Sequence, residues 1–329
     1  MTTDLGPTTV SILLPAYNAR AIVERAIDSV LAQTHRDWEL IVVDDASTDG
    51  TAEAISARYA GEPRVRVLKA PCNGGPARAR NQALQDARGQ WVALIDADDA
   101  WRPERLERLL ARGGHDADLV FDNLCGYDAH ARVETGPVFD ALPDAGFGVD
   151  DLIAPLVENS ELDFGYLKPL MRRSLLGEHG IAYDDVLRTS EDVLLYLELL
   201  IVGARVSATS EAMYIYTTPR GGKSGVFSNH SHSVPNDAAL IAGLERMLER
   251  RQVGPQHPAW GAIAGRIAYL RRVGPIASFY YARRKRDLAG MVRLAATNAS
   301  VRGEIGRKAE EVLGRRLRRL VPGRIGRRT

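Results

Sequence analysis

The sequence predicts an α/β fold in which a mostly parallel central sheet is flanked by helices and followed by a helical C-terminal extension. Short runs of large apolar residues, too short for helices of that composition, alternate with segments whose apolar residues recur at helical spacing. This alternation is typical of βαβ units, whose parallel strands are covered by helices on both faces. From Asn236 onward the pattern stays helical, which predicts the extension.

The expected strands are apolar runs bounded by turn residues or acidic clusters. The first run, residues 10–14, is stopped by Pro15, and the run at 91–95 ends in Asp96-Ala97-Asp98-Asp99. In chain order, strands are expected at residues 10–14, 38–43, 65–68, 91–95, 117–123, 206–208 and 213–217. Residues 126–149 are rich in Gly, Pro and Asp and are expected to form a variable lobe.

The expected helices carry apolar residues on one face. Asn18 is expected to cap the first helix, whose apolar positions include Val23, Ile27 and Val30. Further helices are expected up to Tyr59, over 77–87, from Pro103, over 150–157, after 164–169 and over 193–200.

Composition limits the partners that the chain can have. The chain has 329 residues, enough for one large or two ordinary domains, and a formal net charge of +1. Residues 271–329 nevertheless hold 17 Lys and Arg against 4 Asp and Glu, whereas the preceding 270 residues hold 26 against 38. A basic tail on an acidic body predicts a polyanionic surface as the partner of the tail. Two cysteines without metal-site spacing favour a reduced setting, and the N-terminus does not read as a signal peptide.

Three loops are expected to meet at one edge of the sheet, because ligands of such sheets bind beyond the carboxyl ends of the strands. These loops are residues 15–18, 44–49 and 96–99, and the last two are acidic. Asp96 and its neighbours Asp98 and Asp99 repel one another, so a cation is expected between them. A divalent ion such as Mg²⁺ or Mn²⁺ would also recruit substrate phosphates. The alternative is an acidic loop before a helix whose first turn favours aspartate.

Two further segments carry charged residues that suit a binding site. Asn73-Gly74-Gly75 precedes a helix with Arg78 and Arg80, an arrangement that favours phosphate binding, with a tight turn and surface arginines as the alternative. It is neither a P-loop nor a dinucleotide-binding glycine pattern. Glu191 and Asp192 begin a helix, where the helix dipole favours carboxylates whatever their function.

Taken together, these segments resemble glycosyltransferase family 2, a family of inverting, metal-dependent sugar transferases with the GT-A fold. The matching motifs are VSILLPAYN at 10–18, ELIVVDDASTDG at 39–50, NGGPARARN at 73–81 and DADD at 96–99. TSED at 189–192 resembles the later Glu-Asp motif of the family, and 214–220 with Ser224 resembles its Tyr-x-Tyr-Arg…Ser loop. Residues 122–128 and 164–169 are similar to succinoglycan-type exopolysaccharide glucosyltransferases.

The resemblance implies roles at the matching positions. Asp192 would be the catalytic base, and Asp98 or Asp99 would bind Mn²⁺ or Mg²⁺. Asp45, or Asp44, would hold the uracil or the ribose. The other residues implied at the substrate are Pro15, Ala16 and Tyr17 around the base, Asp96 near the ribose, Arg78 or Arg80 at the nucleotide, Glu191 in the Glu-Asp motif, and Arg220, Lys223 or Ser224 at the diphosphate.

The implied activity is transfer of a hexose, glucose or a related sugar, from a UDP-sugar to a saccharide or lipid-linked saccharide in exopolysaccharide or cell-surface glycan synthesis. A catalytically silent sugar-nucleotide-binding or scaffold protein is the alternative from another class. A nucleotidyltransferase would carry a Gly-rich loop with a basic residue after the first strand, which Pro15–Asn18 does not match. A GT-A domain is expected over 1–232, with a nucleotide-binding half at about 8–122 and an acceptor half at about 123–232, followed by a basic helical region at 233–329.

The basic tail predicts where the chain works. Residues 315–321 and 324–328 join basic and apolar residues at helical spacing, which suits a helix lying on an anionic membrane. A solvated tail and nucleic-acid binding are the alternatives, and nucleic acid is not expected as a partner. The expected location is cytoplasmic and peripheral, at the inner face of the cell membrane. No run approaches the apolar length needed to span a bilayer.

Overall fold

The structure is a computed structural model that describes residues 9–143, 147–153, 164–218 and 237–320, with the backbone alone for residues 218, 277, 284 and 311–320. Its contacts divide the chain into two compact units, Met1–Ile263 and Ala264–Thr329. The first unit holds the sheet and every described residue to which the sequence assigns a role at the substrate, the metal or the reaction.

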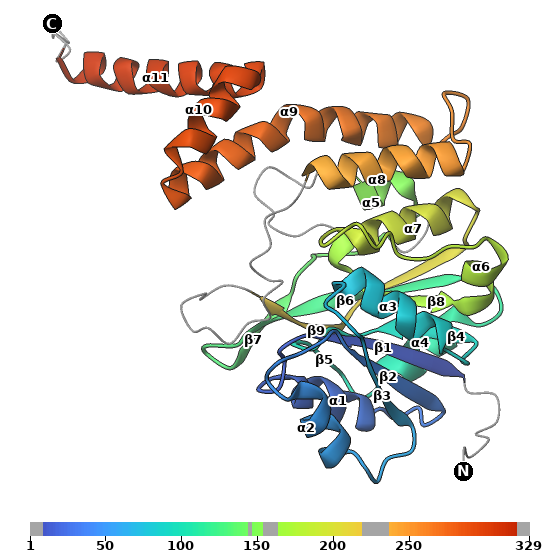
Figure 1. The fold of residues 1–329 in the computed structure, drawn as a ribbon. Coiled ribbons are helices and arrows are strands. Elements are labelled where there is room, and N and C mark those ends of the chain that lie inside the picture. The colour runs from blue at the N-terminus through green and yellow to red at the C-terminus, as the bar shows by residue number, and fades with distance from the viewer. Residues whose placement is uncertain (1–8, 144–146, 154–163, 219–236, 321–329) are drawn as a thin grey trace, which may run out of the picture. The chain divides into compact units, whose positions relative to one another are not determined.

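One mixed sheet runs through the first unit (Figure 1). Its strands are β1 (Val10–Ala16), β2 (Trp38–Asp44), β3 (Val65–Lys69), β4 (Trp91–Leu94), β5 (Ala100–Trp101), β6 (Leu119–Asp128), β7 (Val133–Pro137), β8 (Leu170–Arg172) and β9 (Val206–Thr218). Within the described part of the chain the order is β3-β2-β1-β4-β8-β6-β9-β5, and β7 pairs with β6. The first four strands pair in parallel and the intervening segments are helical, which confirms the predicted α/β class.

The second half of the sheet is less parallel than expected. β8 runs antiparallel to both β4 and β6, whereas β6 and β9 are parallel. The short strands expected at 206–208 and 213–217 are one strand. Its pairing to β6 continues past the polar residues Ser210 and Glu211, because the register shifts on either side of Asn123 and leaves those two residues without a partner residue in the pairing. Part of the expected variable lobe is the hairpin of β6 and β7.

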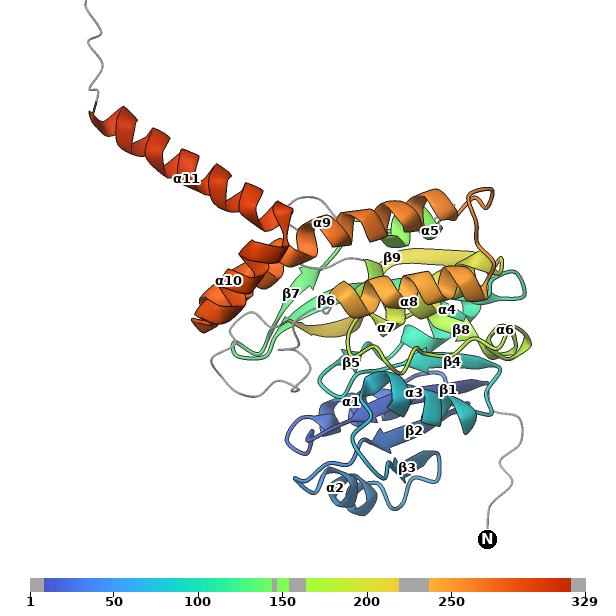
Figure 2. The same cartoon turned by 45° about the horizontal axis from the view of Figure 1, so that its top comes forward.

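Within the first unit, helices flank the sheet (Figures 1 and 2), and the second unit adds further helices. They are α1 (Val23–Leu31), α2 (Thr51–Arg58), α3 (Pro76–Gln85), α4 (Arg105–Gly113), α5 (Val149–Ile153), α6 (Arg173–Glu178), α7 (Glu191–Ile201), α8 (Asp237–Arg250), α9 (Trp260–Lys285), α10 (Leu288–Thr297) and α11 (Ala299–Leu320). The helical pattern predicted from Asn236 onward is therefore confirmed as far as the structure describes it.

Asn18 does not cap α1, so that expectation is wrong. Its backbone is left-handed, with φ of 47°, a conformation that asparagine tolerates better than most residues. Its N–H donates to Ser47 Oγ at 2.8 Å, and its Oδ1 accepts from the Thr48 N–H at 2.8 Å. Asn18 thus joins the loop after β1 to the loop after β2, and α1 starts at Val23 without a side-chain cap.

A fully buried ion pair lies beneath the second half of the sheet. Arg105 on α4 donates to both carboxylate oxygens of Asp122 on β6, at 2.8 and 2.7 Å, and both side chains are completely buried. Arg105 also donates to the Lys168 carbonyl at 2.5 Å. The pair therefore fixes the backbone of the segment that leads into β8.

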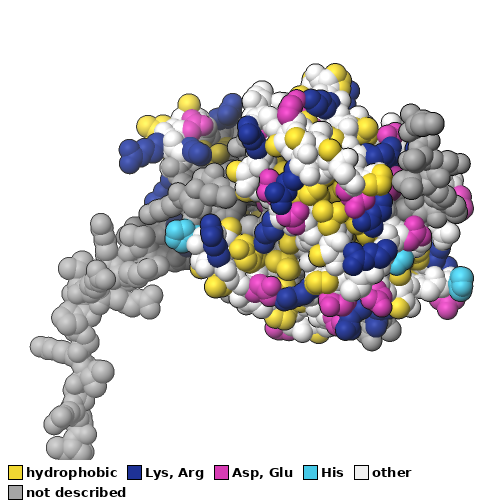
Figure 3. Space-filling view, turned by 90° about the horizontal axis from the view of Figure 1, so that it is seen from below, with side chains coloured by type: hydrophobic (Ala, Val, Ile, Leu, Met, Phe, Trp, Pro, Cys, Tyr) yellow, Lys and Arg dark blue, Asp and Glu magenta, His cyan; other side chains and the backbone are white. Residues whose placement is uncertain are grey.

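The face of the first unit seen in Figure 3 carries Lys and Arg side chains interspersed with Asp and Glu side chains. On α2, Arg58 lies 3.5 Å from Glu24 and 3.1 Å from Asp28, both on α1. Exposed pairs of this kind contribute little to stability, about 0–1 kcal/mol each.

The second unit consists of helices in the residues that the structure describes. Tyr280 on α9 donates to Glu304 on α11 at 2.9 Å, and the Asp287 carboxylate accepts from the Gly290 N–H at the start of α10. Among the described helices of the whole chain, none combines the length and apolar character needed to cross a bilayer.

Candidate active site

The carboxyl ends of β1, β2 and β4 lie side by side. Ala16 on β1 is in register with Asp44 on β2, and the Asp45 N–H donates to the Ala16 carbonyl at 2.8 Å. On the other side of β1, the Ile95 N–H donates to this strand at 3.1 Å, one residue before Asp96. The loops that carry these aspartates therefore leave the sheet from neighbouring strands.

Asp45 holds the glycine loop before α3. Its carboxylate is 3% exposed and accepts from the Gly74 N–H through Oδ1 and from the Gly75 N–H through Oδ2, both at 2.7 Å. Charge-assisted hydrogen bonds of this kind are about twice as strong as neutral ones. Asp45 therefore orients the glycine loop, and each of its oxygens keeps a further lone pair for the uracil or ribose contact that the sequence predicts.

Asp44 is the residue of this pair with an open acceptor. It is 4% exposed, and its Oδ2 accepts from the Ser47 N–H at 3.2 Å. Its Oδ1 is buried and has no hydrogen-bond partner. A buried carboxylate oxygen without a donor is costly, so a ligand N–H or O–H is the natural partner at this position.

Arg80 is the centre of a buried ion cluster that joins distant parts of the chain. Its guanidinium is 3% exposed, and it donates to Asp96 at 2.6 Å through Nη2 and to Glu191 at 2.5 Å through Nη1. Asp192 Oδ1 lies 3.5 Å from the same Nη1. Arg80 therefore holds the carboxylates together, and its Nη groups are already engaged by the protein.

Lys168 completes the cluster and is a residue that the sequence analysis did not select. Its ammonium is 6% exposed, donates to Asp192 Oδ2 and lies 3.2 Å from Asp96 Oδ2. It lies in the segment 164–169 that is similar to succinoglycan-type enzymes, but that similarity gives the lysine no role. The one available signal is that such a lysine, if buried, needs carboxylates around it. Two cations and three carboxylates thus meet where α3, α7 and the end of β4 converge.

The charges in this cluster shift the pKa values of its members. Burial alone raises the pKa of Asp96, but the charges of Lys168 and Arg80 outweigh it and hold the pKa below its ordinary value. Burial also raises the pKa of Glu191, which the charge of Arg80 offsets only in part. Burial lowers the pKa of Lys168, but the nearby Asp192 and Asp96 outweigh that effect, so the ammonium stays charged.

Asp99 faces the protein interior. It is 1% exposed, and its oxygens accept from Tyr214 Oη at 2.6 Å and from the Thr217 N–H at 2.7 Å. Burial raises its pKa well above the ordinary value, and the charges of Asp98 and Asp96 raise it further. Its donors on β9 engage both oxygens, so Asp99 anchors the acidic loop to β9.

Asp98 lies in the chain between Asp96, which belongs to the ion cluster, and Asp99, and it is partly exposed. Its carbonyl accepts from Arg25 Nη2 at 2.5 Å and from the Thr217 hydroxyl. The guanidinium of Arg25 also lies over the Tyr127 ring, 4.3 Å from its centroid. Arg25 on α1 is a second residue that sequence patterns did not select, and it fixes the backbone of the acidic loop.

The remaining predicted residues lie around this edge or outside the described residues. Pro15 and Tyr17 are partly exposed at the end of β1, and Ala16 is 2% exposed. Arg78 is exposed beside the glycine loop. Arg188 Nη1 donates to Asn73 Oδ1 at 3.1 Å and was not selected from the sequence. Arg220, Lys223 and Ser224 fall outside the described residues.

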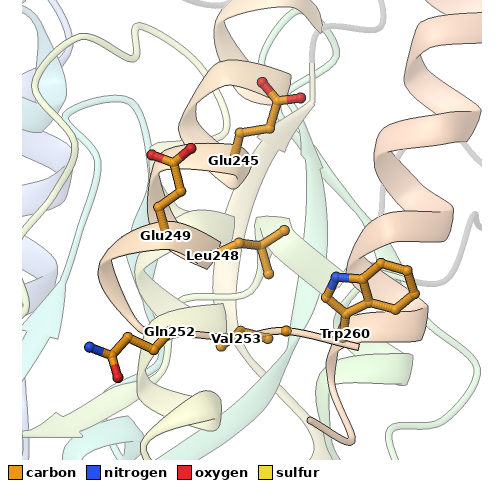
Figure 4. A pocket seen from close by; sticks show the side chains of 7 residues that line it. Glu245, Leu248, Glu249, Gln252, Val253 and Trp260 are labelled. Atoms are coloured by element: carbon orange, nitrogen blue, oxygen red, sulfur yellow. The ribbon is translucent and has the colours of Figure 1, made fainter. Parts of the chain in front are cut away.

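A separate open hollow of about 510 Å³ lies on α8 and the start of α9 (Figure 4). Trp260 and Leu248 face one another there, with Glu245 and Glu249 on α8 beside them. No residue predicted for the substrate, the metal or catalysis lines this hollow.

We call the carboxyl ends of β1, β2 and β4, with residues 44–45 and 96–99, the acidic edge. The carboxylates there fit a metal that takes part of its ligands from a substrate. Within the described residues, no group of three or more His, Cys, Asp and Glu side chains is arranged to hold an ion by itself. Mg²⁺-type ions are commonly held by one or two carboxylates plus substrate phosphates, and Asp98 suits that arrangement. The edge thus combines an open acceptor at Asp44, a carboxylate at Asp98 and a buried carboxylate at Asp192.

Comparison with known proteins places this site in a family. The profile described as "Glycosyl transferase family 2" matches residues 11–135. The succinoglycan biosynthesis protein ExoO of Rhizobium meliloti (strain 1021) is 34% identical over 245 residues, which cover 73% of this chain and 68% of the relative. The succinoglycan biosynthesis protein ExoU of the same strain is 37% identical over 210 residues, which cover 62% of this chain and 60% of the relative.

Solved structures share the fold. Staphylococcus aureus TarS 1-349 in complex with UDP-GlcNAc superposes with a TM-score of 0.60 at 19% identity, over 88% of this chain and 91% of that one. The mannosyltransferase PcManGT from Pyrobaculum calidifontis, in complex with GDP-Man and Mn²⁺, gives a TM-score of 0.57 at 19% identity, over 94% and 81%. These similarities confirm the expected GT-A-type architecture. Together with the sequence relatives, they show that the chain belongs to glycosyltransferase family 2.

Proposed function

We propose that the protein is an inverting, metal-dependent glycosyltransferase that moves a hexose from a UDP-sugar to a saccharide or lipid-linked saccharide. The observation that carries this proposal is the position of Asp192. Asp192 is 6% exposed and lies in one ion cluster with Asp96 of the acidic edge, and its Oδ1 accepts no hydrogen bond. The proposed base, Asp192, and the proposed nucleotide-binding residue Asp96 are thus held by the same buried cations.

The donor would be held by the loops at the strand ends. Asp44 Oδ1 would accept from the nucleobase, next to Pro15, Ala16 and Tyr17. Asp96 would accept from a ribose hydroxyl, because each carboxylate oxygen retains a further lone pair beyond those used by Arg80 and Lys168. A Mn²⁺ or Mg²⁺ ion held by Asp98 would, when bound, stabilise the charge that develops on the departing diphosphate.

Asp192 would remove the proton of the acceptor hydroxyl. General-base assistance of this kind contributes typically about 10²–10⁴-fold to the rate. Attack by that hydroxyl from the face opposite the diphosphate breaks the sugar–phosphate bond and inverts the anomeric carbon. An α-linked donor then gives a β-linked product, and the proton ends on Asp192.

The names of the relatives support an assignment to surface polysaccharide. ExoO and ExoU are described as succinoglycan biosynthesis proteins, and TuaG of Bacillus subtilis (strain 168) as a putative teichuronic acid biosynthesis glycosyltransferase. We therefore infer a role in exopolysaccharide or cell-surface glycan synthesis. The GT-A domain would occupy residues 1–232 and the basic helical region residues 233–329.

The test is turnover of a panel of UDP-, GDP- and ADP-sugars with and without Mn²⁺, in the presence of a short saccharide acceptor. We expect UDP release from one or more UDP-hexoses only with Mn²⁺, and a β-linkage in the NMR spectrum of the product. Binding of UDP-sugars without turnover would favour the silent binding protein instead. No binding of any nucleotide-sugar would contradict both.

The second unit would hold the enzyme at an anionic membrane surface, at the inner face of the cell membrane. Residues 264–329 contain 18 Lys and Arg against 4 Asp and Glu, a surplus of 14. On α10, Leu288 and Val292 lie one turn apart and are 73% and 69% exposed. An exposed apolar face among basic residues suits the interface of an anionic bilayer.

Sedimentation with vesicles that contain phosphatidylglycerol tests this location. The double substitution Leu288→Ser and Val292→Ser should reduce the bound fraction at low salt. Val186→Ser, at a position in the first unit that is 63% exposed, serves as the control. Binding that is equal for all three proteins, or absent in the wild type, would contradict the proposed location and leave the catalytic proposal intact.

A further inference from the structure

The ion cluster contains a buried lysine, Lys168, to which the proposed reaction assigns no role. We propose that Lys168 is a positioning residue: it holds Asp192 by one oxygen so that the other stays open to the acceptor hydroxyl, and it ties Asp192 to Asp96 at the donor edge. This inference rests on the proposed function, because it takes Asp192 as the base.

The contacts of Asp192 are asymmetric. Its Oδ2 accepts from Lys168 Nζ, whereas its Oδ1 is buried without a hydrogen-bond partner and lies 3.5 Å from Arg80 Nη1. The last torsion of an aspartate side chain is broad, so a carboxylate without a fixed partner samples many orientations. Holding Oδ2 leaves Oδ1 facing one direction. The oxygen that accepts the proton is thereby selected before the acceptor arrives.

The ammonium of Lys168 also reaches the acidic edge. Lys168 Nζ lies 3.2 Å from Asp96 Oδ2, so one cation spans the carboxylate assigned to the ribose and the carboxylate assigned to the base. Arg80 also contacts both aspartates, but its hydrogen bonds go to Asp96 and Glu191. Within the residues that the structure describes, Lys168 is the cation that donates a hydrogen bond to Asp192.

The backbone of Lys168 is fixed from two sides, as a positioning role requires. Its carbonyl accepts from Arg105 Nη2 at 2.5 Å, and Arg105 is itself held by the buried carboxylate of Asp122. The preceding carbonyl, of Leu167, accepts from the Tyr196 hydroxyl at 3.1 Å. Tyr196 is one turn after Asp192 on α7, so the lysine and the aspartate are attached to the same helix.

The experiment compares Lys168→Met with Lys168→Arg, and uses Lys69→Met as a matched control at a lysine paired with Glu53 outside the cluster. Methionine keeps the length of the side chain and removes the charge. We expect Lys168→Met to lower kcat about 10²-fold, the cost of a misplaced catalytic group, while KM for the UDP-sugar changes little because Arg80 still holds Asp96. Like Arg80→Met, the substitution removes one cation from the cluster and lowers the Tm, so activity is compared at a temperature at which both proteins stay folded. Lys168→Arg should recover part of the loss, and Lys69→Met should match the wild type.

A double-mutant cycle with Asp192→Asn separates positioning from a general structural role. If Lys168 acts through Asp192, then adding Lys168→Met to Asp192→Asn costs little further activity in single-turnover measurements. If the loss of activity in the double variant equals the product of the losses in the two single variants, the inference is overturned. So would a kcat for Lys168→Met within about threefold of the wild type, or a fall in Tm and nucleotide affinity that accounts for the whole loss. If the wild type itself transfers no sugar, the proposed function fails, whereas a normal wild type with an unaffected Lys168→Met refutes this inference alone.

Discussion

Arg80 and Glu191 are 111 residues apart in the chain, yet Arg80 Nη1 lies 2.5 Å from Glu191 Oε1. The arginine is on the helix that follows the glycine loop, and the glutamate begins the helix that carries Asp192. The contact therefore joins the nucleotide half of the domain to the proposed base. Because the arginine is 3% exposed, removing it leaves its carboxylate partners without their buried cation and lowers the stability of the fold.

Arg80→Met should destabilise the protein by about 3–5 kcal/mol, because it leaves three carboxylates, two of them buried, with one cation among them. Urea denaturation measures the change. Arg78→Met on the same helix is the control: this exposed arginine should change the free energy of unfolding by less than about 0.5 kcal/mol. Equal effects of the two substitutions would mean that the cluster does not stabilise the fold.

Asp192→Asn should abolish sugar transfer, with a loss of about 10²-fold or more, because the amide cannot accept the acceptor proton. The affinity for UDP should stay near that of the wild type, since Asp192 is not assigned to the nucleotide. Asp185→Asn, at an exposed position seven residues earlier, is the control. Loss of UDP binding with transfer retained would reverse the assigned roles.

Gly75→Ala should lower stability and weaken UDP binding together. Gly75 has φ of +87°, and an added Cβ would lie 2.5 Å from Arg188 Nη1 and 2.8 Å from its Cδ. Strain of this kind costs on the order of 1–3 kcal/mol, and it would displace the loop that Asp45 holds. Gly61→Ala, where an added Cβ meets nothing within 4 Å, should leave both the Tm and UDP binding unchanged.

Asp118 provides a pH-dependent contribution to stability. The hydrogen bond from Arg205 lowers its pKa, more than partial burial raises it. The unfolded state therefore takes up the proton first as the pH falls, so the contribution is present above the ordinary value of 3.8 and is lost on acidification through the lowered one. Asp118→Asn should thus destabilise the protein clearly at about pH 6 and much less at about pH 3. A difference that does not shrink with acidification would contradict this origin.

The sequence predicts the nucleotide half of the sheet well because its elements are local. Each apolar run from Val10 to Leu94 is bounded by turn or acidic residues, and the structure has a strand at every one. The second half is harder to predict, because β8 is three residues long and its pairing depends on distant strands. The strand β9 is hard to predict as one strand, because polar residues in its middle interrupt the apolar pattern while its pairing to β6 continues beyond them.

The site shows the same limit at the level of single residues. Motifs identify which loops carry carboxylates, but not which oxygens remain open after folding. Asp44 and Asp45 are adjacent in sequence, yet one has an unpartnered oxygen and the other uses both oxygens on the glycine loop. Lys168 and Arg25 act across the fold, on Asp192 and on the acidic loop, and no local pattern assigns them these contacts.

In the proposed function, the acidic edge binds a nucleotide-sugar through a divalent cation at Asp98. The decisive measurement is isothermal titration of UDP into the wild type and into Asp98→Asn, each with and without Mn²⁺. We expect tight binding to the wild type with Mn²⁺, and weak binding in the other three conditions. Equal UDP affinity in all four conditions would contradict it.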